Sequence, residues 1–215
     1  MSNPTRVPAP RAPAAPIGTV GHVVARHLER LQRGYLADQP AAVATLARLR
    51  RGAGKDAQAV PDLWGLIDTS DLYADPTLTG RDVERAETAV FLAMPLWALH
   101  QQSRRIGMHT AGIELGAAVR KLMPKGEIDE AVRKRFVRAG SASTLTILAV
   151  RLRELVLLLR RDELALDYAL LTDQLFRWQR PGGPESVRAS WGRSFHAYRA
   201  ASESDRDATE AKESR

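Results

Sequence analysis

The sequence contains no cysteine, which excludes disulfide bonds, thiolate metal sites, iron–sulfur ligation and cysteine nucleophiles. Aromatic residues make up only 6% of the chain, and so few argue against a protein that stacks many successive bases. No apolar run reaches the roughly 18–20 residues that a membrane span requires, and the first residues lack the pattern of a secretory signal. We therefore expect a cytoplasmic protein that does not enter a membrane.

The chain carries an excess of positive charge. Its 215 residues include 32 Lys or Arg and 25 Asp or Glu, which gives a formal net charge of +7. Apolar residues make up 44% of the sequence, enough to build a hydrophobic core. This balance predicts a folded protein with an affinity for polyanions.

The two ends of the chain differ in composition from its middle. Residues 1–16 are rich in proline and nearly free of large apolar side chains, and 200–215 contain no Leu, Ile, Val or aromatic residue. Neither segment can bury enough surface to offset the entropy of ordering it. We predict a disordered proline-rich leader at 1–16 and a disordered charged tail at 200–215.

Between these ends the sequence has the pattern of an all-α protein. Apolar residues recur at spacings of three and four, and no segment alternates with a period of two. The predicted helices are 18–37, 40–51, 61–67, a long helix ending near 105, 112–123, 127–139, 142–161, 163–179 and 185–199, with a loop at 69–80. We expect a helical bundle of two packed lobes, residues 17–110 and 111–199.

The sequence lacks the residue spacings of a catalytic or metal site. None of its five histidines forms an H-x-x-x-H or H-E-x-x-H pair, and no E-x-x-H motif of a di-metal bundle occurs. Residues 52–55 faintly resemble a phosphate-binding loop, but Asp56 stands where Ser or Thr should hold magnesium. We therefore predict a non-catalytic protein with no cofactor, no metal and no small-molecule substrate.

The positive charge is concentrated in one stretch. Residues 120–161 contain eleven Lys or Arg and four Asp or Glu, a local excess that attracts phosphate backbones. In the helix at 127–139, Lys134 and Arg138 lie nearly opposite the inward-facing Val132 and Phe136. The candidate nucleic-acid-binding residues are Arg48, Arg50, Arg51, Arg104, Arg105, Lys121, Arg133, Lys134, Arg135, Arg138, Arg151 and Arg153.

Other interpretations of the same residues remain open. Basic runs often form solvated faces, and arginines in the last turn of a helix are favoured by the helix dipole. The basic face would also suit a helical protein-interaction adaptor that docks an acidic partner. An enzyme with a dispersed site is a third alternative, which the missing metal and nucleophile spacings disfavour.

An ordered series of short strings resembles a known family. They are LARLRRG (46–52), PDLW (61–64), ALHQ (98–101), IELG (113–116), RKRF (133–136), LRELV (152–156), LDYA (166–169) and WGRSF (191–195). In this order they resemble the CasB family, the small subunit of the type I-E CRISPR surveillance complex Cascade. The likeness spans residues 20 to 196; the leader and the tail are not part of the family's pattern.

The resemblance implies an all-helical, non-catalytic subunit that is present in two copies in a guide-RNA complex. Such a subunit helps to hold the open R-loop through basic residues that contact the target strand and the displaced strand. The implied partners are the other Cascade subunits, the guide RNA, both strands of target DNA and a second copy of the chain. The positions that match the family's basic sites are Arg50 or Arg51, Arg133, Arg135, Arg138, Arg151 and Arg153.

Overall fold

The computed structural model describes residues 16–55, 60–63 and 65–213, with the backbone alone at 62 and from 199 onward. Its α-helices are α1 (Thr19–Leu36), α2 (Pro40–Leu49), α3 (Ser70–Ala74), α4 (Arg81–Gln101), α5 (Leu115–Lys121), α6 (Glu130–Gly140), α7 (Leu145–Arg161), α8 (Tyr168–Trp178) and α9 (Gly183–Glu213). Two 3-10 turns, η1 (Arg50–Gly52) and η3 (Pro61–Leu63), lie between α2 and α3. These described residues contain no strand, only one isolated bridge between His109 and Leu166, so the predicted all-α class is confirmed.

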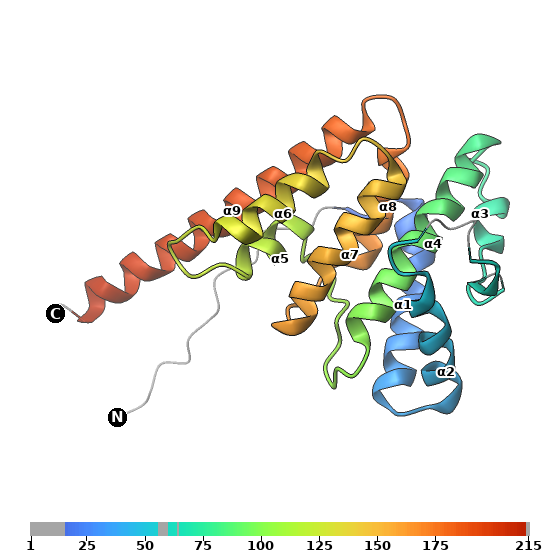
Figure 1. The fold of residues 1–215 in the computed structure, drawn as a ribbon, viewed down its shortest axis with the longest axis horizontal. Helices are drawn as coiled ribbons and strands as arrows, with labels where there is room; N and C mark the ends of the chain where they lie inside the picture. Colours follow the sequence, from blue (N-terminus) through green and yellow to red (C-terminus); the bar gives the residue numbers. More distant parts are fainter. Residues whose placement is uncertain (1–15, 56–59, 64, 214–215) are drawn as a thin grey trace.

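The helices pack around one continuous hydrophobic core. α8 lies against both α1 and α4, while α5 packs along α9 and α6 lies beside α7 (Figure 1). Trp97, Trp178 and Trp191 are buried in this core, as their positions on apolar stripes indicate. Because α8 from the second half packs against α1 and α4 from the first, the two predicted lobes share their core, and the boundary at 110/111 stays a prediction.

Capping residues set where the helices begin. Asp129 accepts hydrogen bonds from the backbone N–H groups of Ala131 and Val132, and Thr144 accepts one from Ile147. These side chains satisfy free donors at the first turns. The helices α6 and α7 therefore begin three residues later than the apolar spacing alone predicts.

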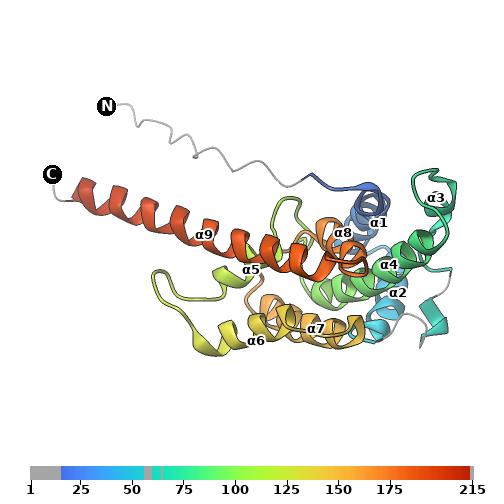
Figure 2. The ribbon, with the colours of Figure 1, turned by 90° about the horizontal axis from the view of Figure 1, so that it is seen from above.

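Two segments differ from the helix predictions. The predicted loop at 69–80 contains the short helix α3, which buries Leu72 against the core. At the other end, α9 continues to Glu213, through most of the segment predicted as a disordered tail (Figure 2). Residues 200–213 contain neither proline nor glycine, so nothing in their backbone chemistry ends the helix. The predicted leader lies, except for Pro16, outside the described residues.

Candidate nucleic-acid interface

The outer side of α6 carries two exposed cations. Val132 and Ala139 are buried under the helix, and Lys134 and Arg138, four residues apart, lie exposed on the side away from them. Neither cation forms an ion pair within the described part of the chain. A shallow hollow of about 450 Å³ covers this side of α6, and its lining residues are Ala131, Arg133, Lys134, Arg135, Val137 and Arg138.

The other two arginines of α6 are engaged with their own helix. Arg133 forms an ion pair of 2.8 Å with Glu130, one turn earlier, and this contact lowers the pKa of the Glu130 carboxyl. Both side chains are about half exposed, so water screens the pair and it contributes little to stability. Arg135 is half-buried and donates a hydrogen bond to the carbonyl of Ala131. Arg133 can therefore leave Glu130 to bind another anion, whereas partial burial and the hydrogen bond to Ala131 hold the side chain of Arg135 in place.

The next helix, α7, contributes one exposed arginine. Leu148, Leu152 and Leu155 bury the inner face of α7, as their spacing predicts. Arg153 is exposed on this helix, but Arg151 is half-buried and pairs with Glu154 at 2.8 Å. Of the two predicted site residues on α7, Arg153 is therefore the one available to a ligand.

The loop after α2 and η1 contacts the side chain of Arg153 on α7. Gly54 follows η1 and packs so closely on Arg153 that a Cβ at Gly54 would lie 2.7 Å from Arg153 Cδ. Arg50 and Arg51 are exposed on η1 itself. The fold thereby brings the loop that follows Arg50 and Arg51 against Arg153, about 100 residues further along the sequence.

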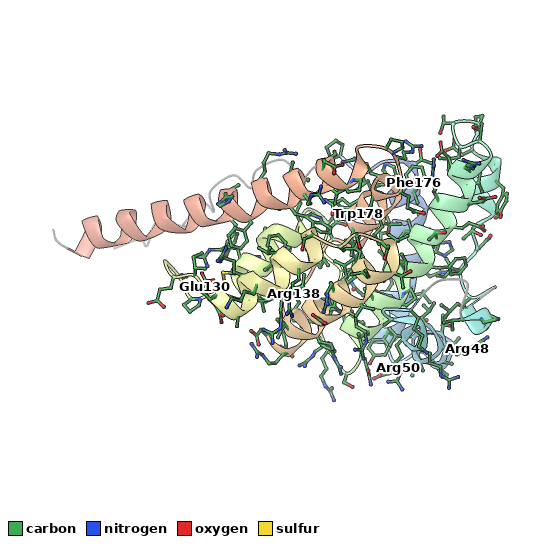
Figure 3. All side chains as sticks on the ribbon, turned by 45° about the horizontal axis from the view of Figure 1, so that its top comes forward. Arg48, Arg50, Glu130, Arg138, Phe176 and Trp178 are labelled. Atoms are coloured by element: carbon green, nitrogen blue, oxygen red, sulfur yellow. The ribbon has the colours of Figure 1, made fainter. Side chains whose placement is uncertain are left out.

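We call Arg50, Arg51, Lys134, Arg138 and Arg153 together the cationic face. All five are exposed and none forms a salt bridge in the part of the chain that the structure describes, although Lys134 lies near enough to Glu130 to help lower the pKa of that carboxyl. Figure 3 shows Arg138 on α6 and Arg50 beyond α7, with Arg48 further along α2. Exposed guanidinium and ammonium groups outside salt bridges are free to bind phosphate oxygens.

Three further predicted site residues have other surroundings. Arg104 forms a 2.8 Å ion pair with Glu163 and is only one-quarter exposed. Arg105 is exposed beside it, in a loop whose Ser103 N–H donates to the hydroxyl of Tyr35 at the end of α1. Lys121 lies over the ring of Tyr198, 5.4 Å from its centroid. Arg104 and Lys121 are thus engaged with neighbouring groups of the protein, whereas Arg105 is exposed.

Two of the buried polar side chains, His100 and Asp173, form hydrogen bonds within the fold. His100 is fully buried and hydrogen-bonds the hydroxyl of Tyr168 at 2.8 Å; burial lowers the pKa of His100 to about 3. Asp173 accepts hydrogen bonds from the backbone N–H groups of Gly18 and Gly21, and its burial raises its carboxyl pKa. No group of three metal-ligating side chains gathers among the described residues.

One surface feature beside α6 was not predicted from the sequence. Between α6 and α9 lies an apolar groove of about 340 Å³. Its lining includes Phe136, Val137, Gly140, Trp191 and Gly192, with Arg188 at its edge. One signal for it is present in the sequence, because Val137 is an apolar residue on the otherwise charged side of α6.

No described helix is both long and apolar enough to cross a membrane.

No curated protein matches the chain. Two solved structures resemble it. The structure titled "Crystal structure of CasB from Thermobifida fusca" is 53% identical, covers 84% of this chain and 99% of its own, and superposes with a TM-score of 0.77.

A second structure, titled "CRISPR RNA-guided surveillance complex", contains a chain of the same fold. It is 22% identical, covers 85% of this chain and 96% of its own, and has a TM-score of 0.64. The family described as CRISPR-associated protein Cse2 matches residues 45–196, which is more than half of the chain. Together with the identity to CasB, this match confirms the resemblance inferred from the ordered strings: the chain belongs to the Cse2 (CasB) family.

Proposed function

We propose that this protein is a non-catalytic, nucleic-acid-binding subunit of a type I-E Cascade complex. In this role it stabilises the R-loop between guide RNA and target DNA, and holds the displaced strand, through contacts that do not depend on sequence. Membership of the Cse2 family and the fold shared with a chain of an RNA-guided surveillance complex support this role. Its partners would be other Cascade subunits, guide RNA, target DNA and a second copy of the chain.

The observation that carries the proposal is the cationic face. Its five side chains come from η1, α6 and α7, are exposed, and form no salt bridge among the described residues. Backbone contacts of this kind neutralise phosphates and release counterions without distinguishing one base from another. A subunit that must accept every target sequence requires such contacts.

The energetics of R-loop formation give these contacts a clear role. The RNA–DNA heteroduplex is about as stable as the DNA duplex that it replaces, so small protein contributions decide the balance. Cations that hold the displaced strand oppose its return to the target strand. The R-loop would therefore persist longer with the subunit than without it.

The test compares R-loop lifetimes of a complex reconstituted with wild-type chain and with the double variant Lys134→Ala/Arg138→Ala. The variant should shorten the lifetime for all target sequences alike. It should also reduce the slope of log K against log salt by about 1.4–2, because two phosphate contacts are lost. The matched control is Arg81→Ala, an exposed arginine at the start of α4, outside the cationic face.

Two outcomes would contradict the proposal. One is an R-loop lifetime that the double variant leaves unchanged although the subunit is present in the complex. The other is a loss confined to particular target sequences, which would indicate that the protein reads base edges.

A further inference from the structure

Exposed aliphatic side chains gather on α6 and α7. In the described part of the chain seven large hydrophobic side chains are exposed, and three of them, Val137, Ile147 and Val150, lie on these two helices. Their exposed fractions are 54%, 42% and 43%. Single exposed apolar residues are common on protein surfaces, but a group of them within a cationic surface calls for an explanation. We call these three residues the aliphatic strip.

Two members of the strip lie on the outer side of α7. Leu148 and Leu152 are buried, and the helical period places Val150 on the opposite side of the helix. Ile147 lies one turn before Val150, and the exposed Arg153 lies one turn after it. The outer side of α7 therefore carries exposed carbon next to an exposed guanidinium.

The third member, Val137, has cations on both sides. It lies three residues after Lys134 and one residue before Arg138, and all three line the hollow of about 450 Å³ on α6. The carbon chains of lysine and arginine are themselves apolar up to the charged group. The hollow thus combines an apolar surface with two charged groups that form no salt bridge in the described part of the chain.

The helix α7 lies between the two groups of cations. Figures 1 and 2 both place α7 between α6 and α2, and η1 continues directly from α2. Ile147 and Val150 therefore lie on the helix between the cations of α6 and those of η1. Exposed carbon and exposed cations alternate across this surface instead of forming separate patches.

The charge around the aliphatic strip favours a nucleic acid over a protein segment. The helices α6 and α7 contain only two carboxylates, Glu130 and Glu154, and each pairs at 2.8 Å with an arginine of its own helix. The five cations of the cationic face remain in excess of these two pairs. The centre of a protein–protein interface is typically depleted of charged residues. A strand of nucleic acid instead combines phosphates with the apolar faces of bases and sugars, and so complements both components.

The exposed carbon also favours a single strand over a duplex. A duplex presents its phosphates outward and keeps the faces of its bases stacked inside, so cations alone would bind it. A single strand can turn the faces of its bases toward the protein while their polar edges stay in water. Because every base has such a face, these contacts do not depend on sequence.

We propose that the aliphatic strip contacts the bases and sugars of a single strand of nucleic acid whose phosphates are bound by the cationic face. This inference rests on the proposed function, because it concerns the same surface. The strip adds a contribution to binding that does not arise from charge, so it is not weakened by salt as phosphate contacts are. It also gives the surface a preference for single strands.

The test uses the double variant Ile147→Thr/Val150→Thr, which replaces exposed carbon by hydroxyl groups and keeps the branch at each Cβ. Fluorescence anisotropy measures binding of the isolated full-length chain to a labelled oligodeoxynucleotide, either single-stranded or in a duplex, at several salt concentrations. The variant should bind the single strand about three- to tenfold more weakly than wild type at every salt concentration. The slope of log K against log salt, and the affinity for the duplex, should stay unchanged.

Ile106→Thr is the matched control. Ile106 is 52% exposed in the loop between α4 and α5, outside the aliphatic strip, and the substitution makes the same chemical change. This control should bind the single strand like wild type. A second comparison is Lys134→Ala/Arg138→Ala, which should reduce the salt slope that the threonine variant leaves intact. The melting temperature of each variant checks folding, and it should stay close to that of wild type because the changed side chains are exposed.

Three outcomes would overturn the inference. Wild-type affinity of the threonine variant for the single strand would show that the strip does not contact it. An equal loss of affinity for single strand and duplex would exclude a contact with the faces of the bases. Normal binding of the oligonucleotide, together with weaker incorporation into a complex assembled without this subunit, would assign the strip to a neighbouring protein. The proposed function fails separately, if Lys134→Ala/Arg138→Ala also binds nucleic acid like wild type.

Discussion

Gly54 lies against the side chain of Arg153, with the position of its absent Cβ 2.7 Å from Arg153 Cδ and 3.1 Å from Arg153 Cβ. The backbone at Gly54 has a φ of +78°, in the left-handed region that favours glycine. The loop thus passes close to α7 because residue 54 has no side chain. This contact holds the loop that follows Arg50 and Arg51 of η1 against Arg153 of α7.

Replacing Gly54 by alanine should therefore disturb the interface as well as the loop. A non-glycine residue at this φ costs about 1–2 kcal/mol, and the new methyl group would displace Arg153. We expect Gly54→Ala to lower the melting temperature and to weaken nucleic-acid binding. Fluorescence anisotropy with single-stranded DNA measures the binding, and differential scanning calorimetry measures the stability.

Gly65→Ala is the control for Gly54→Ala. Gly65 has a φ of +70°, but its added Cβ would meet nothing within 4 Å. It should show the cost of the backbone conformation without any loss of binding. Equal binding by the two variants would mean that the contact between Gly54 and Arg153 does not organise the interface.

The sequence predicts the helices well because each buries an apolar stripe, but it predicts their ends less well. Asp129 and Thr144 move the starts of α6 and α7, since a side-chain cap fixes the first turn whatever the apolar spacing is. The helix α3 has only five residues, too few for a periodic pattern to emerge. The continuation of α9 to Glu213 does not follow from burial, because residues 200–213 contain no Leu, Ile, Val or aromatic residue; the absence of proline and glycine there permits it.

The candidate site is predictable in part. The outward direction of Lys134 and Arg138 follows from the helical period once Val132 is placed inward. The proximity of Gly54 to Arg153 does not follow from local patterns, because it arises from the packing of distant segments. The groove likewise forms between two helices, α6 and α9. The sequence predicts the apolar side of each helix, but it does not predict that these sides lie next to each other.

The start of α1 depends on a contact with α8. Asp173 accepts the backbone N–H groups of Gly18 and Gly21, and a Cβ at Gly21 would lie 2.3 Å from Asp173 Oδ2 and 2.8 Å from the carbonyl oxygen of Ala169. Gly21→Ala should therefore reduce the free energy of unfolding by about 1–3 kcal/mol, as overpacking typically does.

Urea denaturation measures the effect of Gly21→Ala. Gly192→Ala on α9 is the matched control, because its added methyl group enters open space and improves helix propensity. The control should be as stable as wild type or more so. If the two alanine variants were equally stable, Asp173 would not constrain α1 in solution.

The buried His100 predicts a pH dependence of stability. Burial lowers its pKa from 6.5 to about 3, so between these values the unfolded chain binds a proton that the folded chain does not. The stability contributed by neutral His100 is complete above pH 6.5 and is lost as the pH falls toward 3. The loss approaches about 1.4 kcal/mol per pH unit at most.

Urea titrations between pH 4 and pH 7 would measure this loss. His100→Gln removes the titrating group, so the variant should lose less stability than wild type between the two pH values. His109 also has a lowered pKa because of burial, so some pH dependence should remain in the variant. Identical pH profiles for wild type and variant would contradict the assignment to His100.

Glu130 competes with phosphate for Arg133. The two side chains form an exposed pair on α6, and the hydrogen bond from Arg133 holds the pKa of Glu130 below its usual value. Glu130→Gln removes the negative charge and releases the guanidinium, while the residue keeps its size and its place in the first turn. An exposed pair is worth roughly 0.2–1 kcal/mol, so affinity for single-stranded DNA should rise about two- to threefold.

The matched control for Glu130→Gln is Glu185→Gln, which removes the carboxylate partner of Arg188 on α9, an arginine that still donates to the carbonyl of Gly140. The first variant should also steepen the salt dependence of binding, since a further cation becomes available to a phosphate. The second should have a smaller effect on both quantities. Equal gains from the two variants would show that net charge alone governs binding, whereas a gain confined to Glu130→Gln would place the strand along α6.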